Sequence, residues 1–389
     1  MRVAIISAVR TPIGKILGNL SKFKAVELGA IAIKEAIKRA NIEVSLIDEV
    51  IVGQVLQGGN GQNPARQSAI LAGIPSSVPA ITINQVCGSG LKAVMLGAQM
   101  IKSGDAHIVV AGGMESMTNT PHALYLRNGI KYGNTEIVDL MIYDGLSCQF
   151  NNNVHMGHLA EYTAEKANIT REEMDQLSYE SHIKAIKAID NGYFKEEIIP
   201  IEVDNKIIDT DETPRRDTSI EKLSQLKPVF KKDGKVTAGN APPLSDGASA
   251  LVLASETKVR ELNLKPLAWI LDYTSYFTEP KDLFFAPIGA FRKLMNKLNI
   301  KDIDEFDLIE LNEAFASQVL ANYKELRWNW NKFNINGGAI ALGHPIGASG
   351  ARILTTLIYS LRRLNKKLGI AGLCLGGGGS VAMAISTEY

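Results

Sequence analysis

The sequence predicts an α/β protein in which helices cover a largely parallel β-sheet. Short apolar, β-branched segments alternate with amphipathic helical segments in the first and last thirds of the chain, and few polar residues interrupt the predicted strands. The 389 residues are enough for two or three domains with sizeable cores. The 34 glycines cluster at 112–113, 337–338 and 376–379, where we expect backbones to approach closely.

Composition excludes several classes of protein. The chain has 42 Lys+Arg and 41 Asp+Glu, so its net charge of +1 indicates neither a nucleic-acid nor a membrane-surface partner. The three cysteines form no Cys-x-x-Cys pair, which indicates a reducing compartment and argues against a disulfide framework or structural zinc. No signal architecture, membrane-length apolar run or peroxisomal C-terminus is visible, so we expect a soluble, cytoplasmic protein.

The first third alternates between strands and helices. Residues 25–40 place apolar side chains at helical spacing and carry Lys and Arg in the last turn, where these cations suit the helix dipole. The other predicted elements, in order, are a strand at 2–6, a strand at 50–52, a helix at 64–73, a strand ending just before Cys87, a helix to about Ser103, and a strand at 107–113.

The corner at Cys87 organises this part of the chain. An apolar run stops at Cys87, and Gly-Ser-Gly leads directly into an amphipathic helical pattern. Unpaired N–H groups and the positive end of a helix dipole would stabilise a thiolate there. A small, buried, unreactive cysteine at a turn is the alternative interpretation.

The middle of the chain, from Glu115 to about Ser245, has a different character. Polar turns and long polar helices replace the apolar strands. A capping box at 170–173 predicts a helix to Asn191 that Gly192 ends in the left-handed conformation. This segment is interpreted as an insertion that covers a substrate site on the main domain.

The last third returns to alternating elements and contains a weak internal repeat. Its predicted elements are strands at 246–253, 269–272 and 307–310, helices at 288–298, from 312 and through 364, and strands at 369–373 and 381–385. The pattern of corner, helix, strand and Gly-Gly after Cys87 is echoed after Gly347. Two such units facing each other would bring Cys87, His344 and Cys374 to one site.

Each of these residues has an ordinary structural interpretation when it is taken alone. His344 could be a satisfied loop histidine, Cys374 a buried inert thiol, and Asn312 with Glu313 a helix cap. Together they suit the chemistry of a thioester. A nucleophilic cysteine can carry an acyl group, a histidine can move its proton, and a second cysteine with a pKa near the working pH can remove an α-proton.

Several longer motifs make the chain resemble the thiolases, most closely their acetyl-CoA acetyltransferase branch. The resemblance runs nearly end to end through VRTPIG at 9–14, GQNPARQ at 61–67, NQVCGSG at 84–90, GGMESM at 112–117, TAGN at 237–240, NEAFA at 312–316, GGAIALGHPIGASG at 337–350 and CLGGG at 374–378. It implies a five-layered αβαβα fold built from two similar halves with an inserted loop domain. The implied division is 1–116 plus 246–267, 117–245, and 268–389, usually in a homotetramer.

The resemblance also implies roles for individual residues. Cys87 would carry the acyl group, His344 would activate it, and Cys374 would deprotonate a second acetyl-CoA. One oxyanion hole would combine His344 with a water held by Asn312, and the other the N–H groups of Cys87 and Gly376. The positions expected to contact the substrate or coenzyme A are His155, Met156, Ala238, Ala314, Phe315, Arg215 and Arg216. Arg215 and Arg216 belong to a basic run that could equally be a solvated loop face.

The predicted function is reversible Claisen condensation of two acetyl-CoA to acetoacetyl-CoA and coenzyme A through an acyl-cysteine, with no permanently bound cofactor and no metal. A thiolase of broader chain length and a catalytically silent acyl-CoA-binding or scaffold protein are the alternatives. A decarboxylating ketoacyl synthase is disfavoured because Asn312 stands where that class has a second histidine, and a metal site at Cys148, His155 and His158 lacks a fourth ligand.

Three segments depart from the family pattern. After His155-Met-Gly comes His158-Leu, where the family has small residues. The stretch 241–243 reads Ala-Pro-Pro, where the acetyl-CoA branch commonly has Ala-Ser, so a serine contact to pantetheine is missing. The stretch 326–331 is unusually rich in tryptophan, and the sequence assigns it no role.

Overall fold

The computed structural model describes residues 1–388, so Tyr389, the last residue of the predicted third domain, lies outside the described residues. The elements of the first third are β1 (Val3–Arg10), β2 (Gly14–Lys15), α1 (Ala25–Ala40), η1 (Val44–Leu46), β3 (Glu49–Gly53), α2 (Pro64–Leu71), β4 (Ala80–Ile83), α3 (Ser89–Ser103) and β5 (Ile108–Ser116). Every element expected here is present, and α1 has the predicted bounds.

The middle segment holds short strands, three α-helices and one π-helix. Its elements are β6 (His122–Ala123), β7 (Val138–Asp139), η2 (Met141–Leu146), β8 (Ser147–Cys148), β9 (Val154–His155), α4 (Met156–Lys166), α5 (Arg171–Asp190), β10 (Ile201–Val203), β11 (Lys206–Ile208) and α6 (Ile220–Ser224). The capping box that predicted α5 is present, because the side chains of Thr170 and Glu173 bond each other's backbone N–H groups.

The last part of the chain contains β12 (Ser245–Ser255), α7 (Glu256–Glu261), β13 (Ala268–Phe277), η3 (Pro280–Phe285), α8 (Ala286–Leu298), η4 (Ile303–Glu305), β14 (Leu308–Leu311), α9 (Ala316–Leu326), η5 (Trp330–Lys332), α10 (Ala339–Leu342), α11 (Ser349–Arg363), β15 (Leu368–Leu375) and β16 (Gly379–Ser386). Helix α9 begins at Ala316 and has Phe315 at its N-cap. The interpretation of Asn312 and Glu313 as a helix cap is therefore wrong.

The large sheet shows the internal repeat directly. Its strand order is β14-β15-β16-β13-β1-β12-β5-β3-β4, with β2 paired to β12. The first half is read outward from the short pairing of β1 with β13. Its first two strand pairs, β1–β12 and β12–β5, are antiparallel, and its last two, β5–β3 and β3–β4, are parallel. The second half follows the same series, and its last step is a parallel bridge between Ile309 and Phe333. The expectation of a largely parallel sheet was wrong: strands buried on both faces have the same apolar pattern in either direction.

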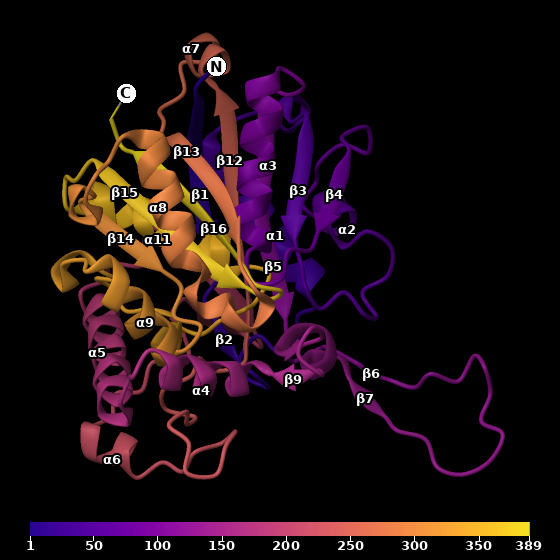
Figure 1. The fold of residues 1–389 in the computed structure, drawn as a ribbon. Helices are drawn as coiled ribbons and strands as arrows, with labels where there is room; N and C mark the ends of the chain where they lie inside the picture. The colour runs from indigo at the N-terminus through magenta and orange to yellow at the C-terminus, as the bar shows by residue number, and fades with distance from the viewer. Residues whose placement is uncertain (389) are drawn as a thin grey trace.

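Three large hydrophobic cores pack helices against the two halves of the sheet. Alternate residues of one strand enter different cores, so in β5 Ile108 and Val110 face α1 while Val109 and Ala111 face α3. Helices α3 and α11 pack against each other in the central core between the two halves of the sheet, and α8 covers the outer face of the second half. With α1 on the outer face of the first half, the layers follow the expected αβαβα order. Figure 1 shows the first half at the right and the second at the left.

The two central helices approach each other through glycines at their N-terminal ends. A β-carbon on Gly90 of α3 would lie 2.8 Å from the carbonyl oxygen of Gly347, and one on Gly350 of α11 would lie 2.5 Å from the backbone nitrogen of Leu91. A β-carbon on Gly113 of β5 would lie 2.1 Å from the same Gly347 oxygen. Because these neighbours are backbone atoms, side chains at the three glycines would force the two halves apart.

A buried ion cluster holds the middle segment on the first half. The Arg10 guanidinium on β1 lies 2.6 Å from Glu197 and 2.6 Å from Asp211, both of which belong to that segment. All three side chains are buried. Since a buried charge without its partner is strongly unfavourable, this cluster fixes where the segment lies on the sheet. In Figure 1 helices α4, α5 and α6 run along the lower edge of the molecule.

The tryptophan-rich segment has a packing role. Trp328 is buried and stacks on Phe333 with ring centroids 4.6 Å apart, and Trp330 packs against Tyr323 at 4.5 Å. These rings pack at the C-terminal end of α9, beside Phe333, which forms a parallel β-bridge with Ile309. Among residues 1–388, no helix combines the length and apolar character that crossing a membrane requires.

The close approach of Gly90 to the Gly347 carbonyl predicts that a side chain at position 90 lowers the free energy of unfolding. Gly90→Ala should lower the stability of the folded protein by about 1–3 kcal/mol, because overpacking against fixed backbone cannot relax without separating α3 from α11. The measurement is a thermal or guanidinium unfolding curve, with the exposed residue change Gln99→Ala on the same helix as the control. Equal unfolding midpoints for the two variants would contradict a tight helix–helix contact at Gly90.

Candidate active site

A cavity of about 490 Å³ between the two halves and the middle segment contains the predicted catalytic residues. Cys87, His344, Cys374 and Gly376 all line it. Of the residues expected to contact the substrate, His155, Met156, Ala238, Ala314, Phe315 and Arg215 line it as well. Asn312 and Arg216 do not line it. The facing corners of the two repeats therefore do meet, as the internal repeat predicted.

The turn before Cys87 is held in an unusual backbone conformation. Val86 has φ +48°, which is rare for a β-branched residue and costs on the order of 1–3 kcal/mol. Side chains on either side hold the turn: Asn84 Oδ1 accepts from the Val86 N–H at 2.9 Å, and Ser89 Oγ donates to the Val86 carbonyl at 2.7 Å. The turn sets Cys87 at the cavity wall, two residues before α3 begins.

The expectation of a low pKa for Cys87 was wrong for the free protein. Burial raises the pKa of Cys87 to about 12, although the backbone N–H groups of Cys87 and Gly376 act in the opposite direction. Desolvation of a thiolate outweighs what a helix N-terminus provides, and the nearby Glu115 carboxylate raises the pKa further. Cys87 is thus a neutral thiol at rest and needs an acceptor for its proton.

His344, which lines the same cavity, is the candidate for that acceptor. It lies in a glycine-bounded turn whose geometry is set by Gly343 at φ +97° and by a bond from the His344 N–H to Ser245 Oγ at 3.2 Å. Burial, and secondly the Arg352 guanidinium, lower the pKa of His344 to about 3. The imidazole is therefore neutral in the resting protein. Its Nδ1 bonds Ser349 Oγ at 2.5 Å, and its Nε2 has no protein partner within residues 1–388.

Cys374 lies near the end of β15 and lines the same cavity as Cys87. It is almost completely buried. Burial, and secondly the proximity of Cys87, raise the pKa of Cys374 well above its ordinary value. The condition set for a base, a pKa near the working pH, is not met in the resting protein. Asn312 is also buried, and neither of its side-chain polar atoms bonds another group of the described chain.

The entrance to the cavity is made by the middle segment. His155 caps α4 by accepting from the Gly157 N–H at 3.0 Å, and its ring stacks on Phe230 with centroids 4.7 Å apart. Burial lowers the pKa of His155, so this ring is uncharged. Pro242 and Pro243 line the wall where the family pattern has a serine. Phe230 was not anticipated, because nothing in the sequence singles it out from other loop aromatics.

The two candidate arginines have separate surroundings. Arg215 lines the cavity, whereas the Arg216 guanidinium pairs with Asp190 at 2.5 Å on the surface. The imagined metal site is not formed either: within residues 1–388 no group of three His, Cys, Asp or Glu side chains is arranged to hold a metal ion. Cys148 instead accepts a bond from Asn151 Nδ2 at 3.1 Å.

Glu115 is a site residue that sequence reasoning passed over. Its carboxylate is fully buried and accepts the N–H groups of Val55 at 3.1 Å, Leu56 at 3.1 Å and Gly347 at 2.8 Å. Burial raises the pKa of Glu115 to about 7 despite these bonds. The side chain therefore ties the His344 turn of the second half to the first half. Its position inside the GGMESM motif was the available signal.

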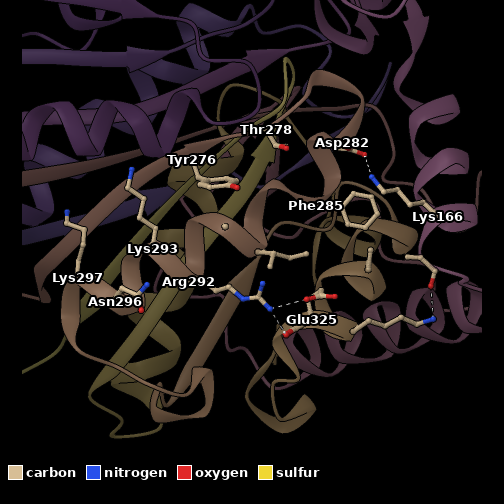
Figure 2. A pocket seen from close by; sticks show the side chains of 15 residues that line it. Lys166, Tyr276, Thr278, Asp282, Phe285, Arg292, Lys293, Asn296, Lys297 and Glu325 are labelled. Carbon is tan, nitrogen blue, oxygen red and sulfur yellow. Dashed lines mark hydrogen bonds and ion pairs between the residues drawn. The ribbon is translucent and has the colours of Figure 1, made fainter.

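A larger cavity of the described chain lies elsewhere. It measures about 1140 Å³ and is lined by residues of β13, α8, α9 and α4, as Figure 2 shows. Its cations have partners, with Lys166 on Asp282 at 2.7 Å and Arg292 on Glu325 at 3.0 Å. It contains no cysteine or histidine and none of the predicted site residues. The chemistry of this protein is therefore assigned to the smaller cavity.

Comparison with known proteins agrees with the geometry. The family model of the thiolase N-terminal domain matches residues 3–257, and that of the thiolase C-terminal domain matches residues 264–387. The chain belongs to the thiolase family. It is 48% identical to an acetyl-CoA acetyltransferase of Pseudomonas aeruginosa and 49% identical to one of Cupriavidus necator, and each alignment covers 99% of both chains.

Solved thiolase structures have the same fold. The crystal structure of the Bacillus anthracis acetyl-CoA acetyltransferase superposes with a TM-score of 0.96 at 43% identity, and covers 99% of this chain and 98% of its own. The Acat5 thiolase of Ascaris suum, solved in complex with coenzyme A, superposes with a TM-score of 0.95 at 43% identity, over 99% of this chain and all of its own. The five-layered thiolase fold expected from the sequence is confirmed.

Proposed function

We propose that this thiolase is an acetyl-CoA acetyltransferase, which condenses two acetyl-CoA to acetoacetyl-CoA and coenzyme A and runs the reverse thiolysis. The observation that carries the proposal is the meeting of Cys87, His344 and Cys374 in one cavity. The printed names of the relatives from P. aeruginosa and C. necator support acetyl-CoA as the substrate.

In the first half-reaction the Cys87 thiol passes its proton to His344 and attacks the carbonyl carbon of acetyl-CoA. The bond from Cys87 Sγ to the acetyl carbon forms, the bond to the coenzyme A sulfur breaks, and the leaving thiolate takes the proton from His344. The N–H groups of Cys87 and Gly376, which favour a negative sulfur in the resting site, are also suited to stabilise the oxyanion.

The second half-reaction needs a base, and Cys374 lies in the same cavity as the acetylated Cys87. Burial is the main cause that holds the pKa of Cys374 above its ordinary value. Cys374 passes its thiol proton to His344 and then, as the thiolate, removes an α-proton from the second acetyl-CoA, whose carbon attacks the acetyl group. The new carbon–carbon bond forms as the bond to Cys87 Sγ breaks, and the Cys87 thiolate takes the proton from His344. Asn312, with free polar atoms, is proposed to hold a water for the enolate oxyanion.

Coenzyme A is proposed to enter as a substrate past the middle segment, since no permanently bound cofactor is needed for these steps. The walls there are formed by the His155–Phe230 stack and by Met156, Ala238, Ala314 and Phe315. These side chains suit the uncharged pantetheine arm. Arg215 is the cavity-lining cation suited to the phosphates at its far end, and Arg216 would have to leave Asp190 to assist.

The three-part division of the chain remains a proposal. It assigns 1–116 with 246–267 to one half, 117–245 to the loop domain, and 268–389 to the other half. It is supported by β12, which follows the middle segment and pairs with both β1 and β5 of the first half.

The nucleophile and the base can be separated by experiment. Incubation with acetyl-CoA should add the mass of one acetyl group to the Cys87 peptide. Cys374→Ala should still acquire that group but lose condensation by at least about 10²-fold, the usual effect of removing a general base. Cys148→Ala is the matched control, because Cys148 is equally buried but lies outside this cavity.

Thiolysis rates decide the acyl preference in the same preparation. An acetyl-CoA acetyltransferase should cleave acetoacetyl-CoA fastest, whereas a maximum at longer 3-ketoacyl chains would identify a degradative thiolase.

Folded enzyme without an acetylated Cys87 would contradict the nucleophile assignment and leave an acyl-CoA-binding role. Normal condensation by Cys374→Ala would place the base elsewhere.

We also propose that the chain assembles as a homotetramer. The arm between β6 and β7 projects far from the body in Figure 1. It exposes Leu124, Tyr125, Leu126, Ile130 and Tyr132, and Tyr132 is 98% exposed. At the other edge of the first half, β4 ends the sheet with an exposed Ile81. A projecting apolar arm and an open edge strand are both features that a second subunit can cover.

Light scattering on the purified protein tests this assembly. Four chains of 42.2 kDa are expected in the wild type. The pair of changes Leu126→Glu and Tyr132→Glu should reduce the particle to a smaller oligomer, since charges on the arm cannot be buried without partners. A monomer in the wild type would contradict the proposal.

A further inference from the structure

The tautomer of the His344 ring determines which of its two nitrogens can accept a proton. Only Nε2 lacks a protein partner, because Nδ1 bonds the Ser349 hydroxyl. If Nε2 carried the ring proton, it could not accept one from Cys87. A group that fixes the proton on Nδ1 is therefore required for the first step.

The hydrogen bonds of Ser349 determine the tautomer. Its hydroxyl lies 2.9 Å from the carbonyl oxygen of Pro345, and a carbonyl oxygen can only accept, so the single hydroxyl proton is donated there. The hydroxyl oxygen must then accept from His344 Nδ1–H at 2.5 Å. The opposite assignment would leave two oxygens 2.9 Å apart with no proton between them.

We propose that Ser349 is a positioning residue that holds His344 in the Nδ1–H tautomer and leaves the Nε2 lone pair for the Cys87 proton. When the proton moves from Cys87 Sγ to Nε2, the Nδ1–H remains bonded to Ser349 Oγ, and that bond strengthens as the ring becomes cationic. The proposal rests on the proposed function for the role of His344 as the acceptor.

The geometry around this pair makes the contribution of the serine large. Ser349 is completely buried at the first turn of α11, where no solvent can replace its oxygen as an acceptor. The other ionisable groups acting on His344 and Cys87 are Cys374, Glu115 and Arg352. Of the three, Arg352 disfavours an imidazolium and Glu115 disfavours a thiolate. The Ser349 bond opposes the first of these effects.

The test follows the alkylation of Cys87 by iodoacetamide against pH, with the Cys87 peptide quantified by mass spectrometry. Ser349→Ala should raise the apparent pKa of the reaction by about one unit and slow it about tenfold near neutral pH. With acetoacetyl-CoA and coenzyme A as substrates, kcat should fall by a similar factor at an unchanged KM. Ser349→Gly serves as a second deletion of the hydroxyl if Ser349→Ala is poorly folded.

Ser360→Ala is the matched control, because Ser360 is a buried serine of the same helix that accepts a bond from Asn336 at 2.9 Å, far along α11 from His344. Its alkylation profile should equal that of the wild type, and Ser349→Thr, which keeps the hydroxyl, should recover most of the reactivity. A Ser349→Ala profile with the wild-type pKa would overturn the proposal even if the rate fell uniformly. Alkylation of Cys87 needs no acyl transfer, so the two proposals can fail separately. A wild type that forms no acetyl-enzyme would contradict the proposed function, while the alkylation profiles would still test the role of Ser349.

Discussion

The contact on which the active site depends is the meeting of α3 and α11 at their N-terminal ends. Gly90 and Gly350 leave no space for side chains there, so the turn after Cys87 and the turn after His344 touch through backbone atoms. Glu115 reinforces the contact by accepting N–H groups from both halves. The contact between α3 and α11 thus fixes the separation between the Cys87 corner of one repeat and the His344 turn of the other.

Burial, more than the helix dipole, determines the charge state of this site. It raises the pKa values of both cysteines and lowers that of His344, so the resting groups are all neutral. A neutral site is suited to the uncharged thioester end of an acyl-CoA, and charge develops only when a proton moves between the groups.

Much of this arrangement was predictable from the sequence, because local patterns determine local structure. Apolar periodicity located α1 and the capping box located α5. The echo between the segments after Cys87 and Gly347 predicted the facing corners. Strand direction was not predictable, since fully buried strands have no polar face to orient them. The pKa of Cys87 was also misjudged, because desolvation depends on packing by residues distant in sequence, such as those of the middle segment.

The positioning groups illustrate the same limit. Glu115 and Ser349 both stand inside motifs that the sequence displayed, yet their bonds to Gly347 and Pro345 are visible only in three dimensions. The strained Val86 gave no sequence signal, because a valine normally indicates an extended strand. Sequence therefore located the groups that are proposed to react, and structure was needed to find the side chains that orient them.

The central claim, that the first corner carries the acyl group and the second acts on it, is tested most directly by a crystal structure. Cys374→Ala crystals soaked in acetyl-CoA should show an acetyl group continuous with Cys87 Sγ, with its carbonyl oxygen within hydrogen-bonding distance of the Cys87 and Gly376 N–H groups. An acetyl group on another residue, or a carbonyl oxygen turned away from both N–H groups, would contradict the account.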